Sequence, residues 1–182
     1  MMYGENIINP DNYAKQILDI EDHTAKYLFA MKQCELLRTN LLENKVSFGF
    51  ETVASTKEKV DFVRKAIEKG YKVDLLFVSL ESPELCYKRV QDRVSRGGHD
   101  VERTKVFSRY ERTMRFLKDY IELADRAVVY DNSREIPITV FTKKDSDMKI
   151  LRDPSDIPWV DKYIFAFFPE SKRVLDAFSN KP

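Results

Sequence analysis

Cysteine, histidine and long apolar runs are scarce in this sequence, and each scarcity excludes a class of protein. The two cysteines, Cys34 and Cys86, lie on apolar helical stripes, which predicts small buried side chains rather than a disulfide or a metal pair. The two histidines are far apart and no cysteine cluster accompanies them, so we expect no metal site. No window approaches the run of about 20 apolar residues that spans a bilayer, so we expect no membrane segment.

An excess of charge of one sign is also missing. Lys and Arg total 31 against 30 Asp and Glu, a formal net charge of +1, which argues against broad binding to nucleic acids or membrane surfaces. The N-terminal segment MMYGENIINPD lacks the basic and apolar regions of a signal peptide, so we expect a cytoplasmic protein. With 182 residues, 43% of them hydrophobic, residues 1–182 can form one domain with a proper core.

One stretch departs from this balance of charge. Residues 88–115 contain nine Lys and Arg against four Asp and Glu, a local charge of +5. Within it Arg89, Arg93 and Arg96 recur at i, i+4 and i+7, so a helix presents them along one ridge. A concentration of positive charge of this kind predicts a binding site for an anion.

A pair of glycines, Gly97-Gly98, separates this ridge from a second predicted helix. That helix covers about residues 103–123 and carries Arg109 and Arg112 three residues apart. Two arginine-bearing helices joined by a Gly-Gly hinge predict a clamp on phosphate, because the planar guanidinium group matches phosphate oxygens. The alternative is a solvated basic hairpin, since charged runs are usually exposed faces.

Strand and helix patterns alternate from residue 6 to residue 133. This alternation predicts an α/β fold with a parallel sheet and helices on both faces. The segment 71–80 is apolar enough to form a strand buried on both faces of such a sheet. After residue 136 the pattern changes to a β-hairpin and an aromatic tail that packs back on the domain. The other predicted strands are residues 6–9, 46–53 and 127–130.

Polar side chains follow three of the predicted strands. Because the carboxyl ends of parallel strands meet at one edge of a sheet, we expect Asp11, Glu51 and Asp131 along that edge. Asp11 either caps the next helix or takes part in chemistry. Glu51 and Thr52 either hold a magnesium-bound water or a substrate hydroxyl, or form a solvated strand end.

The order of these segments resembles that of the zeta-toxin-like P-loop kinases. The residues that carry the resemblance are NPD, FETVAS, GYKVDLLFVSLESPEL, RVQDRVSRGGHDV, RYERT and YDNS, within about residues 6–133. It implies a P-loop NTPase-like three-layer α/β sandwich with its core at 6–133, a helical arginine lid at 83–124, and a C-terminal hairpin and tail at 136–182. It also implies transfer of the ATP γ-phosphate to a hydroxyl of a nucleotide sugar such as UDP-N-acetylglucosamine, with Mg²⁺.

The resemblance also implies roles for individual residues. Asp11 matches the catalytic base and Glu51 the acid near substrate and metal. Arg93 or Arg96, together with Arg109, match the arginines that clamp the phosphates. The remaining matches are Thr52, His99 and Asp100 on the substrate side, where the last two fix the geometry of the lid, and Arg112 and Asn132 on the nucleotide side.

One motif of the family has no counterpart. The Walker A signature G-x-x-x-x-G-K-[ST] should precede NPD, and the five glycines, at 4, 49, 70, 97 and 98, cannot supply it. Because this loop and its lysine bind the β- and γ-phosphates, we expect a chain that lacks the first strand and the P-loop and is inactive alone, whereas ATP and Mg²⁺ are the cofactors of the complete family.

Three interpretations follow from this absence. The chain is a truncated kinase, or a non-catalytic remnant that binds a nucleotide or a sugar phosphate. In the third interpretation it is an interaction protein whose open sheet edge pairs with an antitoxin or with a second copy of itself.

Overall fold

The structure is a computed structural model that describes residues 7–98, 100–153, 156–169 and 171–173. The chain forms two compact units, Met1–Val53 and Ala54–Pro182. In the described residues each unit contains helices and a parallel strand pair, so the predicted α/β class is confirmed.

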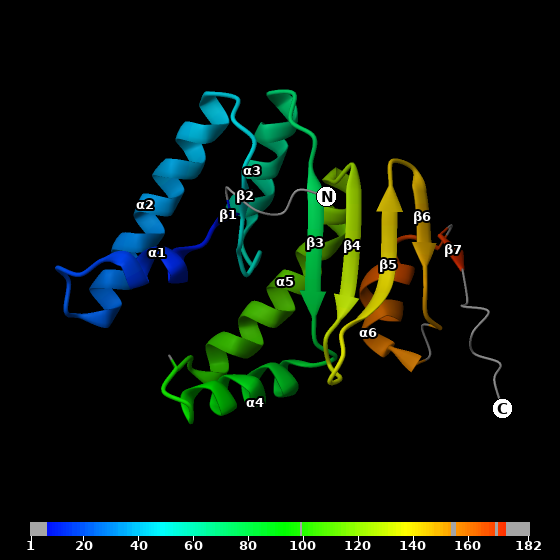
Figure 1. The fold of residues 1–182 in the computed structure, drawn as a ribbon. Coiled ribbons are helices and arrows are strands. Elements are labelled where there is room, and N and C mark those ends of the chain that lie inside the picture. Colours follow the sequence, from blue (N-terminus) through cyan, green and yellow to red (C-terminus); the bar gives the residue numbers. More distant parts are fainter. Residues whose placement is uncertain (1–6, 99, 154–155, 170, 174–182) are drawn as a thin grey trace. The chain divides into compact units, whose positions relative to one another are not determined.

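The first unit contains a two-stranded sheet and two helices (Figure 1). Strands β1 (Ile7–Ile8) and β2 (Gly49–Phe50) pair in parallel. Helices α1 (Pro10–Gln16) and α2 (His23–Glu43) connect them, as the sequence predicts. Strand β2 is shorter than the predicted segment 46–53, of which only two residues form a ladder in the described structure.

The cap of α1 is an asparagine and not Asp11, so that part of the sequence interpretation is wrong. The side chain of Asn9 accepts hydrogen bonds from the backbone N–H groups of Asp11 (2.8 Å) and Asn12 (3.2 Å), and Pro10 is the first helical residue. Asp11 lies exposed in the first turn, where the helix dipole favours a carboxylate. Its carboxylate is therefore not used as the cap.

Helix α2 begins after Asp22, whose carboxylate accepts a hydrogen bond from the Ala25 N–H at 2.6 Å. Cys34 is buried in this helix, and burial raises the pKa of its thiol, as expected of an inert core cysteine. Arg38 is also buried, and its guanidinium carbon lies 4.9 Å from the centre of the Phe50 ring. This contact joins α2 to β2.

The second unit is built on a mixed sheet with the strand order β3-β4-β5-β6-β7. Strands β3 (Asp74–Ser79) and β4 (Arg126–Asp131) are parallel. Strands β5 (Ile138–Lys144) and β6 (Asp147–Ile150) form the predicted hairpin, antiparallel to β4, and β7 (Lys172–Arg173) pairs with β6.

Helices of the second unit gather on one face of this sheet. Helix α5 (Arg103–Leu123) has the predicted bounds, and it lies behind the sheet with α6 (Pro158–Val160) in Figure 1. The π-helical turn η2 (Asp161–Phe165) packs on α5. Helices α3 (Lys57–Glu68) and α4 (Pro83–Val94) lie before and after β3 in the chain.

The main core lies between the sheet, α5 and the aromatic tail. Leu117 and Ile121 of α5 are fully buried against the strands. The tail contributes Trp159, Tyr163 and Phe168 to the same cluster, which confirms that it packs back on the domain. The other buried members are Phe77, Met114, Val129, Val140, Phe141, Ile150, Ile157, Val160 and Ile164.

Strand β3 is buried on one face only, which corrects the prediction for segment 71–80. Phe77 and Ser79 are buried, whereas Leu76 and Val78 are 51% and 55% exposed. Successive side chains of a strand point to opposite faces, so the exposed pair belongs to the face away from α5. The correction has a physical reason: the helices packed in the core of this unit cover one side of the sheet.

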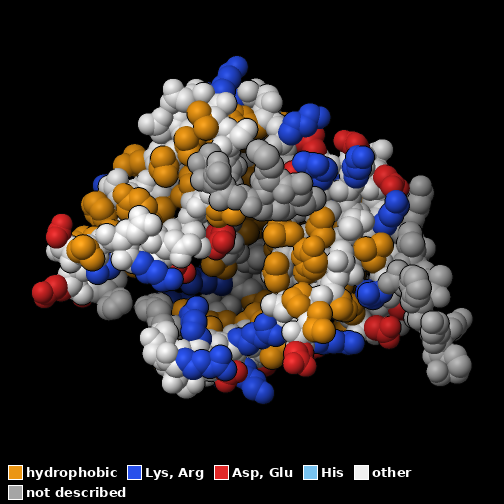
Figure 2. All heavy atoms as spheres, viewed as in Figure 1, with side chains coloured by type: hydrophobic (Ala, Val, Ile, Leu, Met, Phe, Trp, Pro, Cys, Tyr) orange, Lys and Arg blue, Asp and Glu red, His pale blue; other side chains and the backbone are white. Residues whose placement is uncertain are grey.

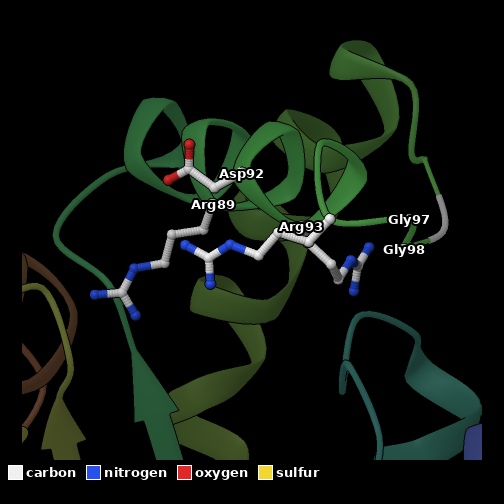
Figure 3. A pocket seen from close by; sticks show the side chains of 6 residues that line it. Arg89, Asp92, Arg93, Gly97 and Gly98 are labelled. Atoms are coloured by element: carbon white, nitrogen blue, oxygen red, sulfur yellow. The ribbon is translucent and has the colours of Figure 1, made fainter.

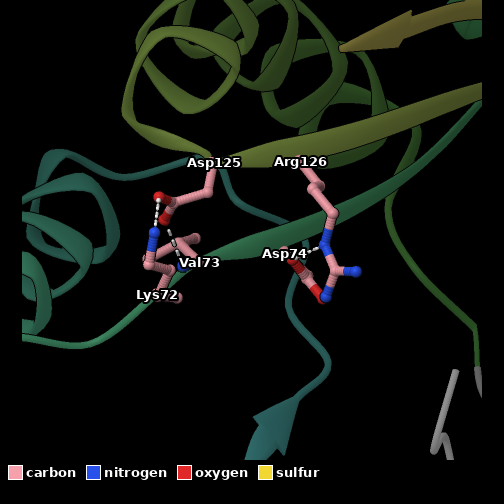
Figure 4. A network of polar contacts seen from close by, with 5 residues as sticks. All are labelled: Lys72, Val73, Asp74, Asp125 and Arg126. Carbon is pink, nitrogen blue, oxygen red and sulfur yellow. Dashed lines mark hydrogen bonds and ion pairs between the residues drawn. The ribbon is translucent and has the colours of Figure 1, made fainter. Parts of the chain in front are cut away.

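Charged groups fix the register of β3 and β4 where the two strands begin (Figure 4). The Asp125 carboxylate accepts a hydrogen bond from the Val73 N–H at 2.8 Å and lies 3.5 Å from the Lys72 ammonium. The Val73 N–H is the main cause that holds the pKa of Asp125 below its ordinary value. Beside it, Arg126 donates two hydrogen bonds to the Asp74 carboxylate.

Candidate functional site

Helix α4 carries Arg89 and Arg93 of the predicted basic ridge, and Arg96 lies in the turn after the helix. It starts where the Ser82 hydroxyl accepts a hydrogen bond from the Leu85 N–H, with Pro83 as the first helical residue. Near its other end the side chains surround a hollow of about 530 Å³. We call this the arginine hollow, and its lining residues are Arg89, Asp92, Arg93, Arg96, Gly97 and Gly98.

The two glycines shape one end of the hollow. The N–H of Gly97 bonds to the Val94 carbonyl and that of Gly98 to the Arg93 carbonyl, both at 2.9 Å, which is the Schellman arrangement. Gly97 has φ +82°, a conformation that favours glycine. A Cβ on Gly98 would lie 2.5 Å from Cγ of Arg93. The pair therefore lets the chain turn directly against the stem of Arg93.

Arg89 is held at the opposite end of the hollow. Its guanidinium donates a hydrogen bond to the Asn132 carbonyl, just after β4, and the Asn132 N–H bonds in turn to the Ser79 carbonyl at 2.8 Å. Figure 3 shows the guanidinium groups of Arg89 and Arg93 on one side of α4, with the Asp92 carboxylate turned to the other. The Arg89 guanidinium thus lies beside the carboxyl ends of β3 and β4, where α/β sheets bind ligands.

The arginines of α5 do not line this hollow. Nε of Arg112 donates to the Ser55 carbonyl at 3.2 Å, and Arg109 is exposed. Asp100 is exposed, and His99 lies outside the described residues. The hollow is therefore built from α4 and the turn that follows it, and the predicted roles of Arg109, Arg112, Asp100 and His99 stay predictions.

The chemistry of the hollow favours an anion with several oxygens. A guanidinium group keeps its charge at all physiological pH values and offers five donors in a plane, which suits phosphate. The residues that line the hollow include three arginines and only one acidic residue, Asp92. Because the site is open to solvent, salt should screen the attraction strongly.

In the first unit the structure brings the NPD and FETV segments together. Nδ2 of Asn9 donates a hydrogen bond to Oε2 of Glu51 at 2.5 Å, where β1 and β2 end side by side. Asp11 lies two residues after Asn9, and Thr52 lies directly after Glu51. Both side chains are exposed. Asn9 was missed by the sequence analysis, although an asparagine directly before a proline is itself a signal for a helix cap.

Asp131 has a different environment from the other two acidic strand ends. It belongs to β4, in a sheet separate from β1-β2 in the described structure, so the strand ladders do not place it on one sheet edge with Glu51. It is 3% exposed and accepts hydrogen bonds from the Trp159 indole (2.5 Å) and from the Ser133 N–H (2.9 Å) and hydroxyl (3.0 Å). This buried carboxylate fixes the end of the strand.

The described part of the chain contains no group of three or more His, Cys, Asp or Glu side chains placed to hold a metal ion. None of its helices combines the length and apolar character needed to cross a membrane.

Comparisons with known proteins bear on the family and on the fold. The family model described as Zeta toxin matches residues 7–146. A solved structure from the PezAT chromosomal toxin–antitoxin system of Streptococcus pneumoniae is 19% identical, with a TM-score of 0.51 over 87% of this chain, and it supports the fold. This chain spans 66% of the length of that one. No curated protein matches the sequence.

Proposed function

The chain belongs to the zeta toxin family, and from this premise we propose that it supplies the arginine lid and the acidic residues of an ATP-dependent phosphotransferase. The acceptor is a hydroxyl of a nucleotide sugar, of the UDP-N-acetylglucosamine kind. The observation that supports this proposal most directly is the arginine hollow, in which Arg89, Arg93 and Arg96 surround a space large enough for a polyphosphate.

Each residue has a defined task in this reaction. Asp11 takes the proton of the acceptor hydroxyl as its oxygen attacks the γ-phosphorus, and the bond from that phosphorus to the β-γ bridging oxygen breaks, releasing ADP. Glu51, oriented by Asn9, holds the acceptor together with Thr52. Arg93 and Arg96 neutralise the charge on the transferred group, with Arg109 in the same role. Asp100 and His99 act on the lid, and Arg112 and Asn132 on the nucleotide.

We expect this chain alone not to catalyse phosphate transfer. The sequence contains no G-x-x-x-x-G-K-[ST], and the backbone amides and lysine of that loop supply the largest electrostatic contribution in such enzymes. The phosphates of ATP fit the charge of the hollow. Phosphate binding through the arginines is therefore the activity to be measured on this chain.

A second function is an interaction with an antitoxin. It rests on the solved structure above, which comes from a toxin–antitoxin system. Copurification of this chain with a protein encoded by a neighbouring gene would support the antitoxin interaction. Such an interaction is compatible with phosphate binding.

Calorimetry tests the binding site. ATP, inorganic triphosphate and UDP-N-acetylglucosamine are titrated into the full chain at low and at high salt. The variant Arg93→Ala/Arg96→Ala should bind at least tenfold more weakly, because each charge-assisted hydrogen bond contributes about 1.5–3 kcal/mol. Lys88→Ala/Lys105→Ala is the matched control, since it removes the same charge outside the hollow. Equal losses in the two variants would show that general charge, and not the hollow, attracts the ligand.

A further inference from the structure

The carboxyl ends of β3 and β4 and the start of α4 form one hydrogen-bonded junction. Residues 80–82 connect β3 to α4, and within them the N–H of Glu81 donates a hydrogen bond to the Ser133 hydroxyl at 2.7 Å. The N–H of Asn132 donates to the Ser79 carbonyl at 2.8 Å. Backbone groups at this junction are therefore held in place by the strands themselves.

Arg89 attaches the middle of α4 to this junction. Its guanidinium donates a hydrogen bond to the Asn132 carbonyl, and Arg93 follows about one helical turn further along α4. A guanidinium has five donors, so one can hold a carbonyl while the others remain for a ligand. Figure 2 shows Lys and Arg side chains gathered over α4 on the viewed face. The Arg89 bond thus sets how far the arginine hollow lies from the strand ends.

Tyr110 attaches α5 to the same junction. Its hydroxyl donates a hydrogen bond to the Leu80 carbonyl, directly after β3, at 3.1 Å. The phenol is half-buried, and burial raises its pKa, so it remains a donor at physiological pH. Tyr110 does not line the hollow. It therefore acts on a ligand there only through the position of the helices.

The two attachments hold both helices of the hairpin. Helix α4 packs on α5, and each helix donates one side-chain hydrogen bond to a backbone carbonyl at the junction. A movement of one helix relative to the other about Gly97-Gly98 would break one of these bonds. The arginine hollow is therefore formed before a ligand arrives. Groups that are already in place bind an anion more tightly, because no ordering cost falls on the binding step.

We infer that Arg89 and Tyr110 are positioning residues, which hold α4 and α5 on the strand ends and so place Arg93 and Arg96 for phosphate. The placement for phosphate rests on the proposed function, whereas the attachment of the helices does not. In this assignment Arg93 and Arg96 contact the ligand, and Tyr110 does not.

Titration of inorganic triphosphate into the full chain tests the placement of the arginines. Tyr110→Phe changes no charge, and the Leu80 carbonyl keeps its second hydrogen bond, from the Ser79 hydroxyl at 3.1 Å. Binding to the folded variant should be about fivefold weaker, which corresponds to one hydrogen bond. Tyr120→Phe is the matched control on the same helix, outside the hollow, and should bind as the parent does. Equal binding by the two variants would overturn the inference.

A double-mutant cycle separates positioning from direct contact for Arg89. Arg89→Ala should weaken triphosphate binding about tenfold in the parent chain, because Arg93 and Arg96 then lose their fixed place. In the Arg93→Ala/Arg96→Ala background the same change should have much less effect. Additive losses would make Arg89 an independent phosphate contact and would remove its positioning role.

Hydrogen exchange without ligand tests the attachment itself. Arg89→Ala and Tyr110→Phe should each speed exchange of the Glu81 and Asn132 amides about tenfold relative to the Val129 amide in the core, and Tyr120→Phe should not. Acceleration of all amides alike would show that the two side chains contribute stability only, and the inference would fail. If the parent chain binds no triphosphate, the proposed function is rejected, and this exchange pattern still decides whether Arg89 and Tyr110 hold the hairpin.

Discussion

The indole N–H of Trp159 donates a hydrogen bond of 2.5 Å to the Asp131 carboxylate, and both side chains are 3% exposed. Trp159 is the one tryptophan of the sequence and lies beyond the region that matches the zeta toxin family. Asp131 ends β4, one residue before Asn132, whose carbonyl holds Arg89. The C-terminal tail therefore supports the strand end on which the arginine hollow rests.

Replacing the indole tests this support. Trp159→Phe keeps an aromatic ring in the core but removes a donor from a buried carboxylate, which costs about 1–3 kcal/mol. Urea unfolding followed by circular dichroism measures the loss. Binding of triphosphate should weaken as well, through Asn132 and Arg89. In a double-mutant cycle, Asp131→Asn should reduce the effect of Trp159→Phe, and strict additivity would show that the two side chains do not interact.

The two glycines at the end of α4 should respond differently to alanine. Gly97→Ala forces a side chain onto a residue with φ +82° and should cost about 1 kcal/mol of stability with little effect on binding. Gly98→Ala places a Cβ 2.5 Å from Cγ of Arg93 and 2.9 Å from its carbonyl oxygen, so this arginine must move. We expect triphosphate binding to fall severalfold in the Gly98 variant only. Equal binding in both variants would mean that the position of Arg93 does not matter.

Acid should weaken the fold through Asp125. The hydrogen bond from the Val73 N–H lowers the pKa of Asp125 below its ordinary value of 3.8, so its ionised form stabilises the folded state. This contribution is complete above pH 3.8 and is lost as the pH falls through the lowered pKa. Asp125→Asn should thus be less stable than the parent near neutral pH, and the difference should shrink in strong acid. Asp61→Asn, on the exposed side of α3, is the control in unfolding measurements across this range.

Tyr120 should be replaceable with a gain in stability. It is 6% exposed, its hydroxyl has no hydrogen-bond partner in the described structure, and burial raises its pKa to about 12. Tyr120→Phe removes a buried polar group that has lost its contact with water, so the free energy of unfolding should rise by about 1 kcal/mol. Thermal unfolding of the two proteins measures this directly, and a lower melting temperature would show that the hydroxyl has a partner.

Local sequence signals predicted the elements of the second unit well. The bounds of α5 follow from its apolar spacing, the start of α4 from Ser82-Pro83, and the hairpin from the turn before Asp147. These features depend on neighbours in the chain. The same holds for Arg89 and Arg93, which the helical period places on one side of α4, whereas Arg96 lies in the turn after the helix.

Long-range contacts were not predictable in this way. Nothing near Asp131 in the sequence indicates that its carboxylate bonds to Trp159, or that Arg112 donates to the carbonyl of Ser55. The exposed face of β3 was mistaken for a buried one because an apolar strand carries no information on what covers it. The Asn9–Glu51 pair joins residues 42 positions apart and depends on the pairing of two short strands.

That pair can be tested by adding one negative charge. Aspartate caps a helix as well as asparagine does, so Asn9→Asp should preserve α1, but it replaces the donor to Glu51 with a second carboxylate. Two carboxylates at this distance repel each other, and we expect a loss of about 1 kcal/mol at neutral pH that disappears in acid, where the carboxylates are protonated. Asn12→Asp adds the same charge at an exposed position of α1 and is the matched control. Hydrogen exchange of the α1 and β2 amides at both pH values measures the difference, and equal exchange in the two variants would show that Asn9 does not hold Glu51.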